Sequence, residues 1–238
     1  MSQLHVRAEP GSVAPAVLLP GDPDRATLVA DTLLDSPRLY NEYRHLLGYT
    51  GSYHGTPVSV QTTGMGCPSL AIVVEEVIRL GAKRLVRIGT CGAVAADVEP
   101  GDLVVATASV PNEGTSRQYL GAVPYAPAAD FAVVQALRTA AERTGRRTHT
   151  GLIQTDDAFY ATERRHVPEL AGRGVLGIEM EASTLFTLGA LRGVSTGCIL
   201  VVSNHIGDEE LLPADRLKEA VLDMVTAALD ALVELETA

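Results

Sequence analysis

The sequence contains no tryptophan, only three phenylalanines and only three cysteines among its 238 residues. With so few aromatic side chains, we expect few positions that can stack on a planar ligand. The cysteines, Cys67, Cys91 and Cys198, are odd in number and far apart. Their spacing argues against a disulfide framework and against a zinc site, and it suits a reducing, cytoplasmic compartment.

Basic residues are also scarce, since 19 Lys and Arg stand against 29 Asp and Glu, for a formal net charge of −10. An acidic protein repels a nucleic-acid backbone, so we expect no nucleic-acid partner. Any phosphate site must therefore be a local cluster of cations. No apolar run is long enough to cross a membrane and the N-terminus lacks the apolar core of a signal peptide, so we expect no membrane partner.

Hydrophobic residues make up 46% of the chain, and no repeat or linker divides residues 1–238, so we predict one domain. Apolar runs typical of strands alternate with amphipathic stretches typical of helices, which predicts the α/β class with a mixed β-sheet flanked by helices. The predicted strands are 17–19, 46–53, 57–62, 85–88, 103–110, 148–154, 175–178 and 196–202. The predicted helices are 24–34 with Asp24 as N-cap, 68–80, 130–144, 180–191 and 214–236, and 111–127 is a predicted loop.

The stretch Gly174–Ser183 carries two glutamates where a strand is predicted to pass into a helix. In an extended backbone Glu179 and Glu181 point to one face and Met180 to the other. Ligands collect at the carboxyl ends of strands in open α/β sheets, and a fixed carboxylate can accept hydrogen bonds from a cis-diol. A solvated helix N-terminus, where the helix dipole favours Glu, explains the same residues equally well.

Arg87 interrupts an apolar strand and precedes the turn that we predict at Gly89-Thr90-Cys91-Gly92. A buried guanidinium needs an anionic partner. We expect the backbone N–H groups of the turn and the Thr90 hydroxyl to bind an oxyanion together with Arg87. The alternative is a structural carboxylate paired with Arg87.

Other polar groups also follow predicted strands. Gly21 and Arg25 lie at a strand–turn–helix connection that can bind an anion, although ordinary connections look the same. Phe159 can stack on a planar ligand or pack its loop onto the core. Ser203 and Asn204 follow the strand 196–202. If these strand ends share one edge of the sheet, the groups converge on one crevice.

Five motifs of this chain, in order and spacing, resemble those of the bacterial high-molecular-mass purine nucleoside phosphorylases, within the nucleoside phosphorylase family that also contains the uridine phosphorylases. The motifs are LPGDPDR (19–25), GMG (64–66), RIGTCGA (87–93), GIEMEA (177–182) and VSNH (202–205). The resemblance implies a three-layer sandwich, phosphate as a co-substrate, no cofactor or metal, and a homohexamer assembled as a trimer of dimers.

The resemblance also implies roles for individual residues. It assigns phosphate to Gly21, Arg25, Arg87 and Thr90, with Arg44 supplied by a neighbouring subunit, and it counts Ile88 and Gly89 among the substrate-binding residues. It assigns the ribose to Glu179, Met180 and Glu181, with His5 reaching the 5′-hydroxyl across the subunit interface. It assigns the base to Phe159, Ser203 and Asn204, and catalysis to Asn204 and Arg87.

Asn204 departs from the family pattern, in which many members carry an Asp that protonates N7 of the base. Asn donates hydrogen bonds but no proton, and its NH₂ suits the O6 acceptor of guanine and hypoxanthine better than the 6-NH₂ of adenine. We therefore predict reversible phosphorolysis of purine (deoxy)ribonucleosides with a preference for guanosine and inosine. Arg216 lies roughly where a helper arginine is expected, after a shortened loop, 207–213.

Three other functions are weighed against this one. A uridine phosphorylase reads uracil with a Gln and an Arg after the Phe-Tyr loop, and residues 159–165 contain no Gln. A nucleoside hydrolase would not need the phosphate set Arg25, Arg44 and Arg87. A non-catalytic nucleoside-binding protein of this fold would not need it either. Phosphate-dependent turnover separates all of these.

Overall fold

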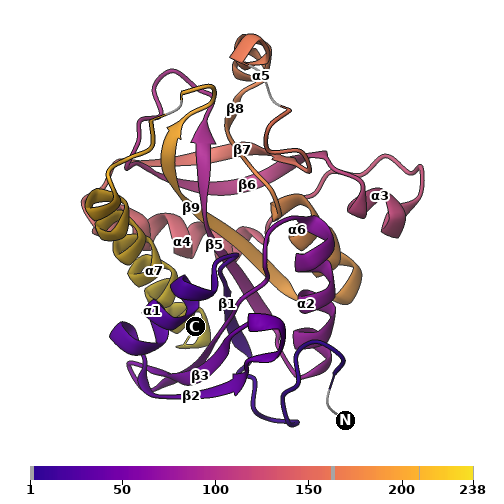
Figure 1. Ribbon diagram of the computed structural model, residues 1–238, viewed down its shortest axis with the longest axis vertical. Helices are drawn as coiled ribbons and strands as arrows, with labels where there is room; N and C mark the ends of the chain where they lie inside the picture. The colour runs from indigo at the N-terminus through magenta and orange to yellow at the C-terminus, as the bar shows by residue number, and fades with distance from the viewer. Residues whose placement is uncertain (1–2, 162–163, 209, 238) are drawn as a thin grey trace.

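The computed structural model describes residues 3–161, 164–208 and 210–237 (Figure 1). Its strands are β1 Ala16–Leu19, β2 Asp35–Asn41, β3 Gly48–Tyr53, β4 Thr56–Gln61, β5 Arg84–Ala93, β6 Leu103–Asn112, β7 Thr148–Asp156, β8 Val175–Glu179 and β9 Ser195–His205. Its helices are α1 Pro23–Leu33, α2 Cys67–Arg79, α3 Thr115–Leu120, α4 Phe131–Arg143, α5 Val167–Gly172, α6 Ala182–Arg192 and α7 Ala214–Thr237, with 3₁₀ turns η1 Tyr43–His45 and η2 Arg164–His166.

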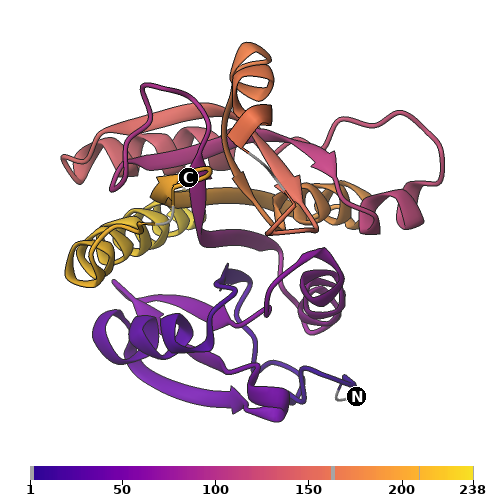
Figure 2. The ribbon, with the colours of Figure 1, turned by 45° about the horizontal axis from the view of Figure 1, so that its top comes forward.

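The strands form one mixed sheet in the order β2-β3-β4-β1-β5-β8-β7-β6-β9. β5 also pairs with β9 in parallel from Arg84 to Ala93, so the half of the sheet beyond β5 closes on itself. Figure 2 shows β5 passing from the half that contains β2, β3 and α1 to the half that contains β6 and β7. The predicted α/β class and mixed sheet are confirmed.

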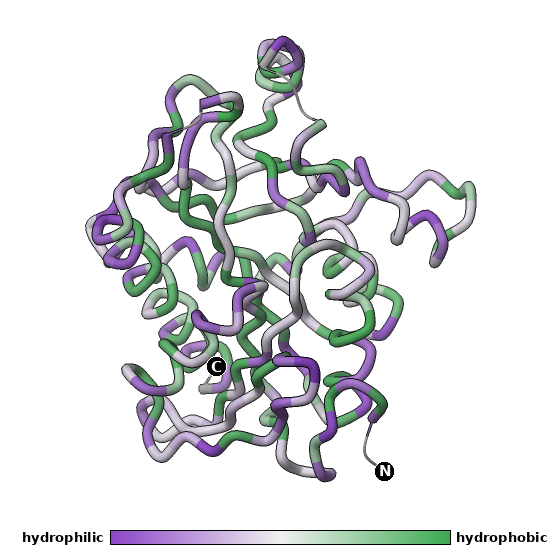
Figure 3. The backbone as a smooth tube through the Cα atoms, viewed as in Figure 1, coloured by the Kyte–Doolittle hydropathy of each residue, from purple (hydrophilic) through white to green (hydrophobic). Residues whose placement is uncertain are grey.

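Helices cover both faces of the sheet because its central strands are apolar on both sides. Val86 and Ile88 of β5 lie in a core cluster with α1, α4 and α7, whereas Leu85 and Cys91 lie in a second cluster with α2 and α6. This alternation is the period-2 pattern of a strand. The hydropathy colours in Figure 3 show the apolar residues concentrated on these central strands and on the helix faces turned toward them.

Every predicted strand and helix is present, but three predictions about local structure are wrong or incomplete. The N-cap of α1 is Asp22, whose carboxylate accepts from the Asp24 N–H at 2.9 Å, and not Asp24 itself. The segment 111–127, predicted to be a loop, is loop only in part, because β6 extends to Asn112 and α3 lies within the segment. The strand β2 was not predicted, because residues 35–39 are all exposed and include Pro37, which edge strands tolerate.

The predicted turn at Gly89–Gly92 is also wrong. These residues continue β5, and each has a register partner on β9, with a bulge between Cys91 and Gly92. Gly89 is required there for a different reason: a Cβ at this position would lie 2.8 Å from the Arg87 guanidinium. None of the helices in the described ranges has the combined length and apolarity that crossing a bilayer requires.

The buried face of α6 makes a prediction about stability. Phe186 is fully buried against the second core cluster, so Phe186→Ala should lower the free energy of unfolding by about 3–5 kcal/mol. Phe131→Ala is the matched control, because Phe131 is 74% exposed and its loss should cost less than about 0.5 kcal/mol. Urea denaturation followed by circular dichroism measures both; equal losses would contradict this description of the core.

Candidate active site

A gap in the strand pairing of β5 defines the site. β1 pairs with β5 only as far as Arg87, and β8 pairs with it only at Gly92 and Ala93. β1 is parallel to β5 and β8 is antiparallel, so their carboxyl ends approach this gap from opposite directions. Ligands bind where strand ends diverge in this way.

Arg87 lies in the gap between two carboxylates. Its Nε lies 2.7 Å from Glu179 Oε2, and its Nη2 forms a short ion pair with Glu181 Oε2. All three side chains are at least 95% buried. The single chain therefore shows the alternative that was set against an oxyanion site, in which Arg87 pairs with structural carboxylates. Burial by itself would lower the pKa of Arg87, but the charges of Glu181 and Glu179 hold that pKa above its ordinary value.

Both carboxylate oxygens of Glu179 accept hydrogen bonds from donors of the protein. Its Oε2 accepts from the backbone N–H of Glu181 at 2.8 Å and its Oε1 from that of Ala182 at 2.9 Å. The hydroxyl of Thr155 lies 2.5 Å from Oε1. Glu179 therefore caps the start of α6, as the helix dipole favours, but in a buried and not a solvated position.

Glu181 has fewer partners than Glu179. Its Oε1 accepts a short hydrogen bond from the Gly66 N–H in the Gly-Met-Gly loop, and its Oε2 pairs with Arg87. Burial raises the pKa of Glu181, and the Arg87 charge partly offsets this. Gly64 and Gly66 both have positive φ, which lets this loop turn back toward the carboxylate. The two glutamates thus lie together, as their spacing predicted, and both pair with the Arg87 guanidinium, which the spacing did not predict.

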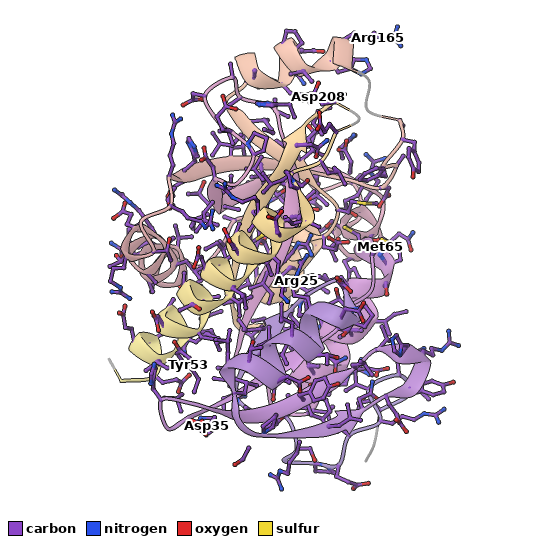
Figure 4. The ribbon with its side chains drawn as sticks, turned by 60° about the vertical axis from the view of Figure 1, so that its left-hand side comes forward. Arg25, Asp35, Tyr53, Met65, Arg165 and Asp208 are labelled. Carbon is purple, nitrogen blue, oxygen red and sulfur yellow. The ribbon has the colours of Figure 1, made fainter. Side chains whose placement is uncertain are left out.

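Arg25 crosses the mouth of the gap from the first turn of α1. Its Nη1 donates to the carbonyl oxygen of Ile88 at 3.1 Å. Burial lowers the pKa of Arg25, and the charges of Arg87 and Glu181 act on it in opposite directions. Figure 4 shows Arg25 and the exposed Met65 near the middle of the molecule. Gly21 lies against this loop, where a Cβ would be 3.2 Å from the Gly64 carbonyl oxygen.

Ser203 and Asn204 lie where β9 bulges against β5. Ser203 Oγ is 3.2 Å from the Cys91 carbonyl oxygen and 2.9 Å from Asn204 Oδ1. Asn204 Nδ2 donates to the carbonyl oxygens of His205 at 3.0 Å and Asp208 at 3.3 Å. The amide orientation follows from these two carbonyls, because a flipped amide would place oxygen against oxygen.

Phe159 does not pack its loop onto the core. Its side chain is 70% exposed and meets Tyr160 edge to face with ring centroids 5.0 Å apart. A cavity of about 420 Å³ adjoins this loop, with Gln154, Asp156 and Ala158 among its lining residues. Phe159 is therefore available to a planar ligand.

His5 and Arg44 are not brought to the gap of their own chain. His5 Nδ1 lies 2.8 Å from Glu76 Oε1 on α2, and Glu76 Oε2 accepts from the His5 backbone N–H at 2.9 Å. Arg44 is exposed on η1, where Arg44 and His45 both have φ near +60°. Such backbone strain in non-glycine residues is typical of functional segments. Arg216 lies on the surface of α7, 3.7 Å from Glu219.

Several contributors were not found by the sequence analysis. Thr155 and Gly66 hold the two glutamates, Glu76 holds His5, and Asn41 bonds both the Arg7 N–H and the Leu46 carbonyl oxygen. Only Gly66 had a signal, as part of the Gly-Met-Gly motif. The contacts of Thr155 with Glu179, of Glu76 with His5 and of Asn41 with Arg7 join residues at least 24 positions apart, so no local pattern marks them.

The three cysteines are free and buried, and Cys67 and the acidic side chains near it have protein partners. Burial raises the pKa of all three thiols, that of Cys91 to about 12, so none is a thiolate nucleophile. Cys67, Glu113 and Asp157 form the one group in the described ranges with metal-like spacing. Cys67 donates to the Met180 carbonyl oxygen, while Glu113 and Asp157 accept from the backbone N–H groups of Ser116 and Gly114.

Comparison with known proteins places the chain among its relatives. Residues 15–235 match the model of the phosphorylase superfamily. The chain is 41% identical over 233 residues to a DeoD-type purine nucleoside phosphorylase of Jannaschia sp. (strain CCS1), covering 96% of this chain and 98% of that protein. Proteins of the same name from Bacillus cereus (strain ZK / E33L) and Oceanobacillus iheyensis are 39% and 40% identical, each over 97% of this chain and 99% of their own length. The chain belongs to the phosphorylase superfamily, in the family of the DeoD-type purine nucleoside phosphorylases.

Proposed function

We propose that the protein catalyses the reversible phosphorolysis of purine ribonucleosides and deoxyribonucleosides to free base and (deoxy)ribose 1-phosphate. The observation that carries the proposal is the Arg87 guanidinium, held by Glu179 and Glu181 at the end of two strands. These carboxylates leave its Nη1 without a hydrogen-bond partner among the described residues. The names of the relatives at about 40% identity support the same activity.

Phosphate binds against the free edge of Arg87. Arg25 supplies the second cation, since only one of its nitrogens is occupied, by the Ile88 carbonyl oxygen. The Thr90 hydroxyl and the backbone at Gly21 complete the chain's own contribution. Charge-assisted bonds from two guanidinium groups suit a dianion. The bound dianion stabilises the oxocarbenium-like sugar that forms as the C1′–N9 bond breaks, and its oxygen then bonds to C1′.

The ribose binds at Glu181. A carboxylate accepts hydrogen bonds only, and Glu181 has lone pairs beyond those used by Gly66 and Arg87, so it can receive the 2′- and 3′-hydroxyls. Glu179 supports this site from behind, because its own oxygens are already occupied. Met180 lies between the two glutamates and packs against the sugar.

The base binds between Phe159, Ser203 and Asn204. The electron pair of the broken C1′–N9 bond stays on the purine, and a donor near N7 and O6 stabilises that charge. The Asn204 NH₂ provides this donor by exchanging its longer bond, 3.3 Å to the Asp208 carbonyl oxygen, for one to the base. Because Asn transfers no proton, bases that leave readily as anions, hypoxanthine and guanine, are preferred over adenine.

Two further groups come from a neighbouring subunit of a homo-oligomer, with a hexamer as the expected assembly. Arg44 adds a third cation to the phosphate. The Glu76 carboxylate holds the His5 Nδ1–H, which leaves Nε2 as an acceptor for the 5′-hydroxyl. This assignment is supported by the strained and exposed backbone of Arg44 and by the contact of His5 with Glu76 on α2 in place of any residue of the gap.

The first test measures base release from inosine, guanosine, adenosine and uridine, each with and without phosphate. We expect release from inosine and guanosine that requires phosphate. Release without phosphate would indicate a hydrolase, and turnover of uridine would indicate the pyrimidine branch. No release from any nucleoside would indicate a binding protein.

The base preference makes a prediction about Asn204. Asn204→Asp restores an acid that can protonate N7, and general acid catalysis is worth roughly 10²–10⁴-fold where the leaving group needs it. We expect kcat/KM for adenosine relative to inosine to rise by about tenfold or more. The rise should grow toward lower pH, since only the protonated Asp donates. An unchanged ratio at every pH would contradict the role given to Asn204.

The shared site makes a prediction about mixed oligomers. Arg44→Ala and Glu181→Gln should each be nearly inactive alone. If Arg44 acts across a two-fold interface, subunits refolded together should recover about a quarter of wild-type turnover, because half of the dimers contain one intact site. Mixing Glu181→Gln with Asn204→Ala is the control, because both residues serve the site of one chain and no intact site forms. Equal turnover in both mixtures would contradict the assignment.

A further inference from the structure

The hydroxyl of Thr155 lies at the centre of a buried network behind Arg87. Thr155 is on β7 and is fully buried. Its Oγ1 lies 2.5 Å from Glu179 Oε1, 2.7 Å from Ser109 Oγ and 3.0 Å from the Ser183 backbone nitrogen. One hydroxyl therefore joins β6, β7, the end of β8 and the start of α6.

Each hydrogen in this network has one permitted direction. The Ser183 N–H can only donate, and a Glu179 carboxylate that faces a guanidinium can only accept. Thr155 has one hydrogen, which goes to Glu179, so it must accept from both Ser183 and Ser109. The Ser109 hydroxyl is therefore the donor in its 2.7 Å contact. The three side chains form a chain of hydrogen bonds that runs from Ser109 to Thr155 to Glu179, and such chains strengthen each bond.

This chain distinguishes the two oxygens of Glu179. Oε1 receives Thr155, and Oε2 receives Arg87 Nε. The terminal torsion of Glu is broad and roughly two-fold, so by itself it holds the carboxylate plane only loosely. The Thr155 hydroxyl, together with the backbone N–H groups of Glu181 and Ala182, fixes that plane. Glu179 and Glu181 pair with the Arg87 guanidinium from two sides. A fixed Glu179 carboxylate therefore fixes the orientation of the guanidinium as well.

We propose that Thr155, supported by Ser109, is a positioning residue for the anion site: it orients the Glu179 carboxylate and through it the Arg87 guanidinium. This inference rests on the proposed function, in which Arg87 binds phosphate. Thr155 touches no substrate, so its loss should weaken phosphate binding more than nucleoside binding.

The chain offers a matched control on α6. Thr187 is also a fully buried threonine, but its Oγ1 has no hydrogen-bond partner among the residues that the structure describes. Thr155→Val and Thr187→Val remove the same hydroxyl and add the same methyl group. They differ in whether that hydroxyl is hydrogen-bonded, in Thr155 to Glu179, Ser109 and the Ser183 N–H. Thr155→Ser keeps the hydroxyl and serves as the rescue variant.

The experiment measures the binding of inorganic phosphate by calorimetry, and the KM values for phosphate and inosine separately. In Thr155→Val we expect the phosphate Kd and KM to rise about tenfold, the effect of one hydrogen bond to a charged group, while the KM for inosine changes less than about twofold. In Thr155→Ser and in Thr187→Val, the phosphate Kd, the phosphate KM and the inosine KM should all stay within about twofold of their wild-type values.

Other outcomes overturn the inference. If folded Thr155→Val binds phosphate as wild type does, or if it weakens phosphate and inosine equally, Thr155 does not position the anion site. If that variant does not fold, Ser109→Ala decides, since it removes only the first donor of the chain and should raise the phosphate Kd about threefold. A wild-type enzyme that releases base without phosphate would refute the proposed function itself.

Discussion

The burial of one positive charge between two negative charges constrains the rest of the site. Arg87 lies within a strand that is buried on both faces, where an unpaired guanidinium would be strongly destabilising. Glu179 and Glu181 supply the pairing, and each carboxylate is held in turn by backbone N–H groups. Removing Arg87 would leave two buried carboxylates facing each other without their shared cation. The end of β8 and the start of α6, which carry these two glutamates, must therefore lie beside Arg87.

The strand topology turns this buried ion cluster into a site. β1 and β8 reach the same edge of β5 from opposite directions and stop on either side of residues 88–91. The closed half of the sheet, completed by the pairing of β5 with β9, keeps the Ser203–Asn204 segment beside that gap. The gap lies on the edge of β5 that faces β1 and β8, and the Ser203–Asn204 segment lies on the opposite edge, against Cys91 and Gly92. His5 is held by Glu76 on α2 and Arg44 is exposed on η1.

Local sequence patterns predicted most of the elements, and their failures have physical causes. The Gly89–Gly92 stretch looks like a turn because it is rich in glycine, but its glycines admit the Arg87 guanidinium and the Ile206 side chain into a strand. β2 lacks any apolar alternation because it lies at the sheet edge. Of the two interpretations of Glu179, the structure shows the helix cap, but in a buried position where the residue also pairs with Arg87, and the binding of a diol by this acidic pair stays a prediction.

The sequence by itself determined the class of fold, the order of the elements and the five motifs, because hydrophobic period, turn residues and motif spacing are properties of short segments. It also determined that Asn204 can transfer no proton. Only the tertiary structure decided which carboxylates pair with Arg87, that Thr155 holds Glu179, and that His5 pairs with Glu76. The Arg87–Glu179 partners lie 92 residues apart. Such pairs are set by strand register and helix packing across the whole sheet, and no local pattern encodes them.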